Sequence, residues 1–460
     1  MASSKKNLSL LSIILITVVS VDSIRNLPAA AKFGPVLITF YVLAAIIFLL
    51  PAALVSAELS AKFKCSGGIY TWVKQAYGDK LGLLAIWLQW AENVIWYPTL
   101  LSFVAGAIGY AINPDLIHSK VYLSSSIIVI FWVLTYINLK GIEISAWFSN
   151  FCTIAGLIAP MLFIIYLGIS WVVSGNPTAI NISLDTMTPK FNEPDMWVSL
   201  TAVMLSFSGI EIASVHASNV ENAQSKLPKA LAWSSIIILT TLVLGSLAIA
   251  IVVPGKDINL VTGIIQAFKI FFAAHHILWV LPIIAVTLAI GGAGSVSNWL
   301  IAPTKGLLFA AEDNNLPKIF KTTNAAGSPS VLLYAQAIIV TIISLIFMIA
   351  PGVNESYWIL TVTATQLYMI MYILMFLAFI KLRRYDKENS QHYFQVPGGM
   401  ATKWLVAILG IAGCFATFLI SFYPPNDMQL GSTTSYALCL VVTVAVISSI
   451  PYLLRKFSQK

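Results

Sequence analysis

Charged residues are scarce in this sequence, and their scarcity excludes most classes of soluble protein. Only 10% of the 460 residues are Asp, Glu, Lys or Arg, whereas 58% are hydrophobic. A soluble domain carries about 25% charged residues. Apolar runs of roughly twenty residues, the length that crosses a bilayer as a helix, recur along the chain. The composition therefore predicts an all-α polytopic membrane protein surrounded by the lipid bilayer.

Clustered cysteines and the signatures of enzymes are also missing. The four cysteines are scattered, without the spacing of a metal site or of a disulfide framework. The sequence has no HExxH zinc motif, no GxSxG nucleophile motif and no Walker-type phosphate loop. We therefore expect no catalytic residues, no metal site and no cofactor, and direct drive by ATP is disfavoured.

Twelve apolar segments are predicted to span the membrane and to form one domain at residues 1–454, followed by a short cytoplasmic tail at residues 455–460. The twelve segments are approximately residues 8–31, 36–57, 82–111, 124–139, 148–173, 197–218, 233–253, 279–310, 330–350, 358–380, 404–422 and 436–454.

The distribution of Lys and Arg predicts the orientation of these segments. If the N-terminus is cytoplasmic, the cytoplasmic loops hold 20 of the 26 Lys and Arg residues, the outer loops hold five, and Arg25 lies within a span. Cytoplasmic loops of membrane proteins carry such an excess. We therefore expect a plasma (inner) membrane protein with both termini in the cytoplasm. The same split explains the net charge of +8 without a nucleic-acid partner.

The stretch at residues 18–28 does not suit a plain membrane helix. It lies in the middle of the first apolar run and contains Asp22 and Arg25. Either charge costs about 2.5–3.5 kcal/mol at the centre of a membrane helix, and Pro28 cannot donate a backbone hydrogen bond. Non-helical backbone at membrane depth is tolerated only inside protein or beside a watery cavity. The stretch therefore predicts a broken helix that forms half of a binding site.

A second break is predicted in the sixth span. Residues 205–214 include Ser-Phe-Ser-Gly followed by Ile210 and Glu211, and glycine and hydroxyl residues interrupt a helix in this way. The two breaks lie five spans apart, so the second copy starts on the opposite side of the membrane. This spacing indicates an inverted repeat of five helices, at about residues 8–173 and 197–380, with two extra helices at about 404–454. Transporters of this kind bind substrate at the midplane, between their broken helices.

Other polar groups lie within the predicted spans. Glu92 and Asn93 occur in the third span, where an ionisable group indicates function by default. Glu92 is therefore a candidate substrate-binding or proton-linked group, or else a buried partner for Arg25, and Asn93 beside it is a candidate substrate-binding residue. Asp22 lies three residues before Arg25, and the two could also neutralise each other.

Four further residues could line a cavity between the spans or only pack between them. They are Trp96, Trp299, Thr365 and Tyr368.

Several segments resemble the amino acid–polyamine–organocation (APC) superfamily of secondary transporters. Its motifs match Gly-Gly-Ile-Tyr-Thr-Trp at residues 67–72, Phe-Ser-Gly-Ile-Glu at residues 207–211 and the loop at residues 221–230. Residues 253–260, 299–306, 394–399 and 423–425 resemble the glutamate/GABA antiporter branch.

The resemblance implies a leucine-transporter-like fold of twelve helices, with alternating access and movement of amino acids by exchange or with protons. By matching position it implies Glu211 as a gating or proton-linked group. It implies contacts with the α-amino and α-carboxyl groups of the substrate at Asp22, Ser23, Ile24, Ser206, Phe207 and Ser208.

An amino acid antiporter or proton-coupled permease, working as a monomer or homodimer, is the function that these observations favour. The planar guanidinium of Arg25 suits a substrate carboxylate. A polyamine or another organic cation is the alternative substrate, because acidic residues outnumber Arg25. Sodium coupling stays open, since Ser295 and Ser297 could coordinate an ion. A membrane sensor or a channel is disfavoured, because no output domain and no symmetric filter are evident.

Overall fold

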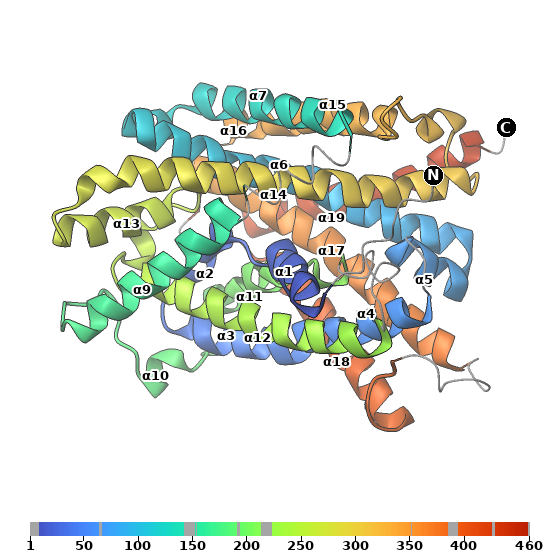
Figure 1. Cartoon of the computed structure of the whole chain (residues 1–460), viewed down its shortest axis with the longest axis horizontal. Helices are drawn as coiled ribbons and strands as arrows, with labels where there is room; N and C mark the ends of the chain where they lie inside the picture. Colours follow the sequence, from blue (N-terminus) through green and yellow to red (C-terminus); the bar gives the residue numbers. More distant parts are fainter. Residues whose placement is uncertain are drawn as a thin grey trace.

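The computed structural model of the chain describes residues 9–63, 67–141, 152, 154–190, 194–212, 223–350, 352–384, 394–425 and 428–458. Within these residues the fold is all-helical and contains no β-strand, as the composition predicts (Figure 1).

Eleven helices in the described ranges are long and apolar enough to cross a membrane. Each overlaps one of the predicted spans. The sixth predicted span is represented by a shorter apolar helix, Trp197–Ile212. The last six residues of that predicted span, 213–218, lie outside the described residues, so the count of twelve stays a prediction.

The described α-helices have the following bounds. They are α1 (Leu10–Val21), α2 (Leu27–Ala31), α3 (Val36–Ala44), α4 (Leu50–Lys62), α5 (Gly68–Tyr77), α6 (Asp79–Ile112), α7 (Lys120–Leu139), α9 (Ala159–Val173), α10 (Leu184–Met187), α11 (Pro194–Ser206), α12 (Ala223–Ala250), α13 (Gly263–Ala274), α14 (Leu281–Glu312), α15 (Ser330–Ser344), α16 (Ile346–Ile349), α17 (Val353–Arg384), α18 (Met400–Ile420) and α19 (Thr433–Ser458).

The first span is broken where the sequence predicts. Helix α1 ends at Val21, and Asp22 and Ser23 then have extended backbone, with ψ angles of 122° and 115°. The chain resumes as a short 3-10 turn, η1 (Ile24–Asn26), and continues as α2, which has Pro28 in its first turn. A proline fits that position because the first amides of a helix have no intrahelical acceptor.

The sixth span is also broken. Helix α11 ends at Ser206, and a turn leads to Gly209, whose φ of +105° lies in the region that side chains with a Cβ rarely adopt. The amide of Gly209 donates to the hydroxyl of Tyr372 on α17, at 2.9 Å. A side chain thus replaces the helical hydrogen bond that the break removes.

Helix α6 runs through the centre of the molecule. It packs against α14 and α17, and most of its residues are buried. Figure 1 shows α7 and α15 on one side of the α6–α14 pair, with α1, α11, α3 and α12 on the other side. The two broken spans therefore meet the long helices α6, α14 and α17 inside the molecule.

Large apolar side chains cover much of the outer surface. Ile236 on α12, Leu405 on α18 and Val442 on α19 are each more than 50% exposed, among many others. A soluble monomer rarely exposes so much contiguous apolar surface. Together with the eleven apolar spans, this surface is that of an integral membrane protein.

Candidate functional site

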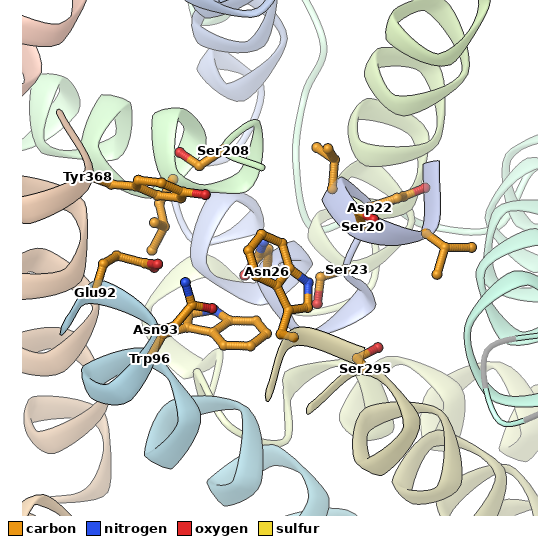
Figure 2. A pocket seen from close by; sticks show the side chains of 14 residues that line it. Ser20, Asp22, Ser23, Asn26, Glu92, Asn93, Trp96, Ser208, Ser295 and Tyr368 are labelled. Carbon is orange, nitrogen blue, oxygen red and sulfur yellow. The ribbon is translucent and has the colours of Figure 1, made fainter. Parts of the chain in front are cut away.

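A small polar cavity lies where the two breaks meet α6, α14 and α17 (Figure 2). Its volume of about 30 Å³ accommodates roughly one or two water molecules, so a substrate can enter only if its walls move. The cavity is lined by Val19, Ser20, Val21, Asp22, Ser23, Asn26, Glu92, Asn93, Trp96, Leu205, Ser208, Ser295, Trp299 and Tyr368.

The two breaks touch each other beside this cavity. A Cβ atom placed on Gly209 would lie 3.3 Å from the carbonyl oxygen of Ser20 and 2.8 Å from the indole of Trp299. Only glycine allows this approach together with a positive φ. Gly209 therefore lets the break after α11 close directly onto the end of α1.

The end of α1 presents free carbonyl groups to the cavity. The backbone amide of Asp22 donates a hydrogen bond to the carbonyl of Val18, and α1 ends at Val21. The last carbonyls of a helix have no intrahelical donor. Among the described residues no amide or side chain donates to the carbonyls of Val19, Ser20 or Val21. These oxygens can accept hydrogen bonds from a bound ligand.

Asp22 and Glu92 are the two carboxylates on the cavity wall. Figure 2 shows them on opposite sides, with the carboxylate of Glu92 directed toward the middle. Asp22 accepts a hydrogen bond of 2.6 Å from Thr241 on α12 through Oδ2, and its Oδ1 has no partner in the described residues. Glu92 is 3% exposed, and none of the described residues donates to it.

Glu211 lies behind the cavity wall with three donors around it. The amide of Gln89 and the hydroxyl of Tyr368 donate to its Oε1 at 2.8 and 2.7 Å, and Tyr372 donates to its Oε2. Tyr368 lines the cavity, whereas Glu211 does not. Tyr368 therefore lies between the cavity and the carboxylate of Glu211.

Arg25 is buried outside the cavity. Its Nη1 donates to Thr99 at 2.6 Å and to Tyr357 at 3.1 Å, and its guanidinium lies 4.9 Å from the ring centre of Trp96. Its Nε and Nη2 atoms have no hydrogen-bond partner in the described part of the chain. Arg25 thus ties η1 to α6 and α17, with Trp96 between it and the cavity.

Two aromatic rings close the cavity beside this arginine. Trp96 and Trp299 approach with ring centres 5.9 Å apart, and Tyr97 donates to the backbone carbonyl of Trp299 at 2.9 Å. The backbone of α14 is thereby held against α6 at the position where Trp299 covers Gly209.

The structure brings eight of the residues predicted for substrate binding to the cavity wall. These are Asp22, Ser23, Glu92, Asn93, Trp96, Ser208, Trp299 and Tyr368. Binding itself stays a prediction for all eight.

The other predicted residues do not line the cavity. Ile24 is a buried core residue, and Phe207 packs edge-on against Tyr41 at 5.5 Å. Ser206 and Thr365 turn their hydroxyls back onto their own helices, at the carbonyls of Val203 and Thr361. Glu211 and Arg25 lie one layer further from the cavity, as described above.

Three polar lining residues were not predicted for substrate binding. They are Ser20, Asn26 and Ser295. Ser20 and Asn26 belong to the polar stretch that first indicated the break, so that stretch contained the signal.

Neither predicted ion pair of Arg25 forms in the described residues. Asp22 is three residues away along the chain, but the extended backbone at Asp22 and Ser23 removes the helical geometry that would bring the two side chains together. Asp22 turns to Thr241 instead. Arg25 bonds to Thr99 rather than to Glu92, which lies two helical turns earlier on α6.

Comparison with known proteins identifies the family. The family model described as amino acid permease matches residues 8–446. The chain is 39% identical to an uncharacterized transporter of Legionella pneumophila, over 98% of this chain and 97% of that protein. It is 28% identical to a glutamate/gamma-aminobutyrate antiporter of Lactococcus lactis, over 99% of this chain and 92% of that protein.

A probable agmatine/putrescine antiporter of Lactococcus lactis is 23% identical over 86% of this chain and 84% of that protein. These proteins are transporters rather than enzymes. Because the family model spans nearly the whole sequence, the chain belongs to the amino acid permease family, within the APC superfamily of membrane transporters.

Proposed function

We propose that this protein is a secondary amino acid antiporter that works by alternating access at the cavity between its two broken helices. The observation that carries the proposal is the meeting of both breaks at one closed polar cavity. Discontinuous helices that meet within the membrane form the substrate site of such transporters. The small volume of the cavity fits a conformation closed around an empty site.

The α-ammonium group of the substrate binds at the end of α1. The carbonyls of Val19, Ser20 and Val21 have no donor in the described residues, and the C-terminal end of a helix carries partial negative charge. Asp22 adds a carboxylate oxygen that lacks a partner. An ammonium group supplies the three donors that these acceptors require.

Exchange of one substrate for another is the coupling that we propose, without a cofactor. Two of the relatives named above are antiporters, which supports this choice. The protein works as a monomer or homodimer in the plasma (inner) membrane. The excess of Lys and Arg in the predicted cytoplasmic loops supports an orientation with both termini in the cytoplasm.

Counterflow in liposomes tests the proposal. The purified protein is reconstituted, the liposomes are loaded with one unlabelled amino acid, and uptake of a labelled amino acid is measured at two pH values with and without sodium. We expect uptake only into loaded liposomes. Uptake into empty liposomes along a proton or sodium gradient would instead show symport, and no uptake of any amino acid would overturn the proposal.

A pair of glycine variants ties the activity to the cavity. Gly209→Ala places a methyl group 2.8 Å from Trp299 at a φ of +105°, so we expect counterflow to be lost. Gly175→Ala is the matched control, because Gly175 also has a positive φ, of +68°, but has no atom within 4 Å of its Cβ position. Equal counterflow activity of the two variants would show that transport does not depend on the break at Gly209.

A further inference from the structure

Glu92 is a buried carboxylate on the cavity wall that accepts no hydrogen bond from the described residues. It is 97% inaccessible to solvent. A carboxylate in such a position is costly unless it meets a cation or takes up a proton. Glu92 therefore needs a cation or a proton to offset the cost of its burial.

The polar neighbours of Glu92 on α6 are already engaged. The amide of Gln89 donates to Glu211, and the amide of Asn93 donates to the backbone carbonyl of Gln89. Each turns away from Glu92 to a partner of its own. The helix that carries Glu92 thus leaves its carboxylate free to face the cavity (Figure 2).

Arg25 attracts Glu92 electrostatically, but it forms no ion pair or hydrogen bond with Glu92 in the described residues. Its Nη1 is bound to Thr99, which lies seven residues after Glu92 on α6, a separation of about 10 Å along the helix axis. Trp96 covers the guanidinium on the side of the cavity. The residues that line the cavity include no Lys, Arg or His.

Glu211 and Asp22, the other two acidic residues near the cavity, differ from Glu92 because both accept hydrogen bonds from protein side chains. Glu211 accepts from three donors and stands behind Tyr368, outside the cavity. Asp22 is on the wall, with one oxygen bound to Thr241 and the other free. Within the described residues, the cavity thus presents one carboxylate that accepts no hydrogen bond and one that has a single free oxygen, on opposite sides (Figure 2).

We propose that Glu92 binds a positively charged group in the distal part of the substrate, so that the transported class is cationic amino acids and the related diamines. The α-ammonium group lies at Asp22 and the end of α1, and the second cation lies against Glu92. This inference rests on the proposed function, because it assigns the substrate of the same cavity.

The test compares substrates and variants in the counterflow assay. The panel consists of arginine, ornithine, agmatine and putrescine as cations, alanine and leucine as neutral amino acids, and glutamate as an anion. We expect the wild-type protein to exchange the cations with the lowest KM. Glu92→Gln keeps the size of the side chain and should raise the KM for the cations at least tenfold. The KM for alanine should stay within about twofold.

Two controls separate charge from folding. Glu312→Gln removes an exposed acid at the end of α14 and should leave every KM unchanged. Competition by each unlabelled compound against labelled substrate in the wild-type protein measures preference without any variant. This competition measurement tests the preference for cations even if the Glu92→Gln variant does not fold.

The outcomes distinguish this inference from the proposed function. If the wild-type protein exchanges neutral or acidic amino acids but no cation, the inference is wrong and the antiporter assignment stands. A Glu92→Gln variant with an altered pH profile and an unchanged KM for cations would make Glu92 a proton site and would also overturn the inference. If no compound is exchanged, the proposed function itself fails.

Discussion

Replacement of Arg25 by methionine should impair transport without destabilising the protein. Arg25 is 1% exposed and lies beside Trp96 and Tyr357. Methionine is unbranched like arginine and reaches as far as its Nε, and its thioether packs well against aromatic rings. The substitution Arg25→Met therefore removes the charge and the hydrogen bonds while the packing of the aliphatic stem is kept.

The contributions to stability nearly offset each other. The variant loses two charge-assisted hydrogen bonds, each worth about 1.5–3 kcal/mol, and a cation–π contact worth up to about 2 kcal/mol. The variant also removes the buried Nε and Nη2 atoms, which have no hydrogen-bond partner in the described residues and each destabilise the fold by about 1–3 kcal/mol. The desolvation of the guanidinium adds several kcal/mol to that relief.

The hydroxyls left behind keep other partners. Thr99 donates to the carbonyl of Trp96 at 2.7 Å, and Tyr357 lies 3.4 Å from the carbonyl of residue 25 itself. We therefore expect the unfolding free energy of Arg25→Met to stay within about 2 kcal/mol of the wild-type value, since neutral-to-favourable outcomes are common when incompletely paired buried ions are replaced.

Transport responds differently, because Arg25 ties η1 to α6 and α17 beside the closed cavity. A change of about 1.4 kcal/mol between the closed and open conformations alters their ratio tenfold, and either contact of Arg25 is worth that much. We expect the counterflow rate to fall at least tenfold. Arg25→Lys keeps the charge but not the planar stack on Trp96, so it should restore the rate only in part.

The two measurements are unfolding of the detergent-solubilised protein, followed by tryptophan fluorescence during SDS titration, and counterflow. A loss of more than about 4 kcal/mol, the cost typical of breaking a well-formed buried pair, would show that Arg25 mainly stabilises the fold. An unchanged counterflow rate with a normal stability would show that its contacts do not take part in transport.

Further predictions concern other contacts of the described residues. Glu58 and Arg383 form a close buried ion pair of 2.6 Å, so Glu58→Gln should lower the unfolding free energy by about 3–5 kcal/mol. Asp79→Asn, at the more exposed Lys74–Asp79 pair, should cost less than about 1 kcal/mol in the same SDS titration. The hydrogen bond from Lys74 lowers the pKa of Asp313, so the link between α5 and α14 is present at neutral pH and is lost only as the pH falls below about 4. Asp313→Asn should therefore leave the shape of the counterflow profile between pH 5 and 8 unchanged, and a shifted profile would contradict this assignment. Tyr372→Phe removes a donor to Glu211 and the acceptor for the Gly209 amide, whereas Tyr368→Phe removes only a donor, so the counterflow rate should fall further in Tyr372→Phe.

The sequence predicts both helix breaks because their causes are local. Pro28 and the charges around it, and Gly209 with the serines before it, disfavour helix whatever surrounds them. The rotation of each helix about its axis is not local, and it decides which side chains line the cavity. Glu92 and Asn93, predicted as binding residues from their polarity, lie on the cavity wall, whereas Thr365, which is also polar, does not.

The position of Arg25 could not be predicted from spacing. A separation of three residues brings side chains together only on a continuous helix. The extended backbone of Asp22 and Ser23 turns Asp22 toward α12 and Arg25 toward α6. The same residues that reveal the break thus invalidate the helical geometry on which the predicted ion pair depends.

The four buried charged residues in and around the cavity, Asp22, Arg25, Glu92 and Glu211, differ in which protein contacts a ligand would have to displace. Glu211 would have to give up contacts with three side chains, and Arg25 would have to leave two hydroxyls and two ring faces. Glu92 and the free oxygen of Asp22 can bind a ligand without breaking a hydrogen bond within the described residues. A substrate therefore gains most by binding at Asp22 and Glu92. Glu211 and Arg25 are better suited to holding the two broken helices in place between one conformation and the next.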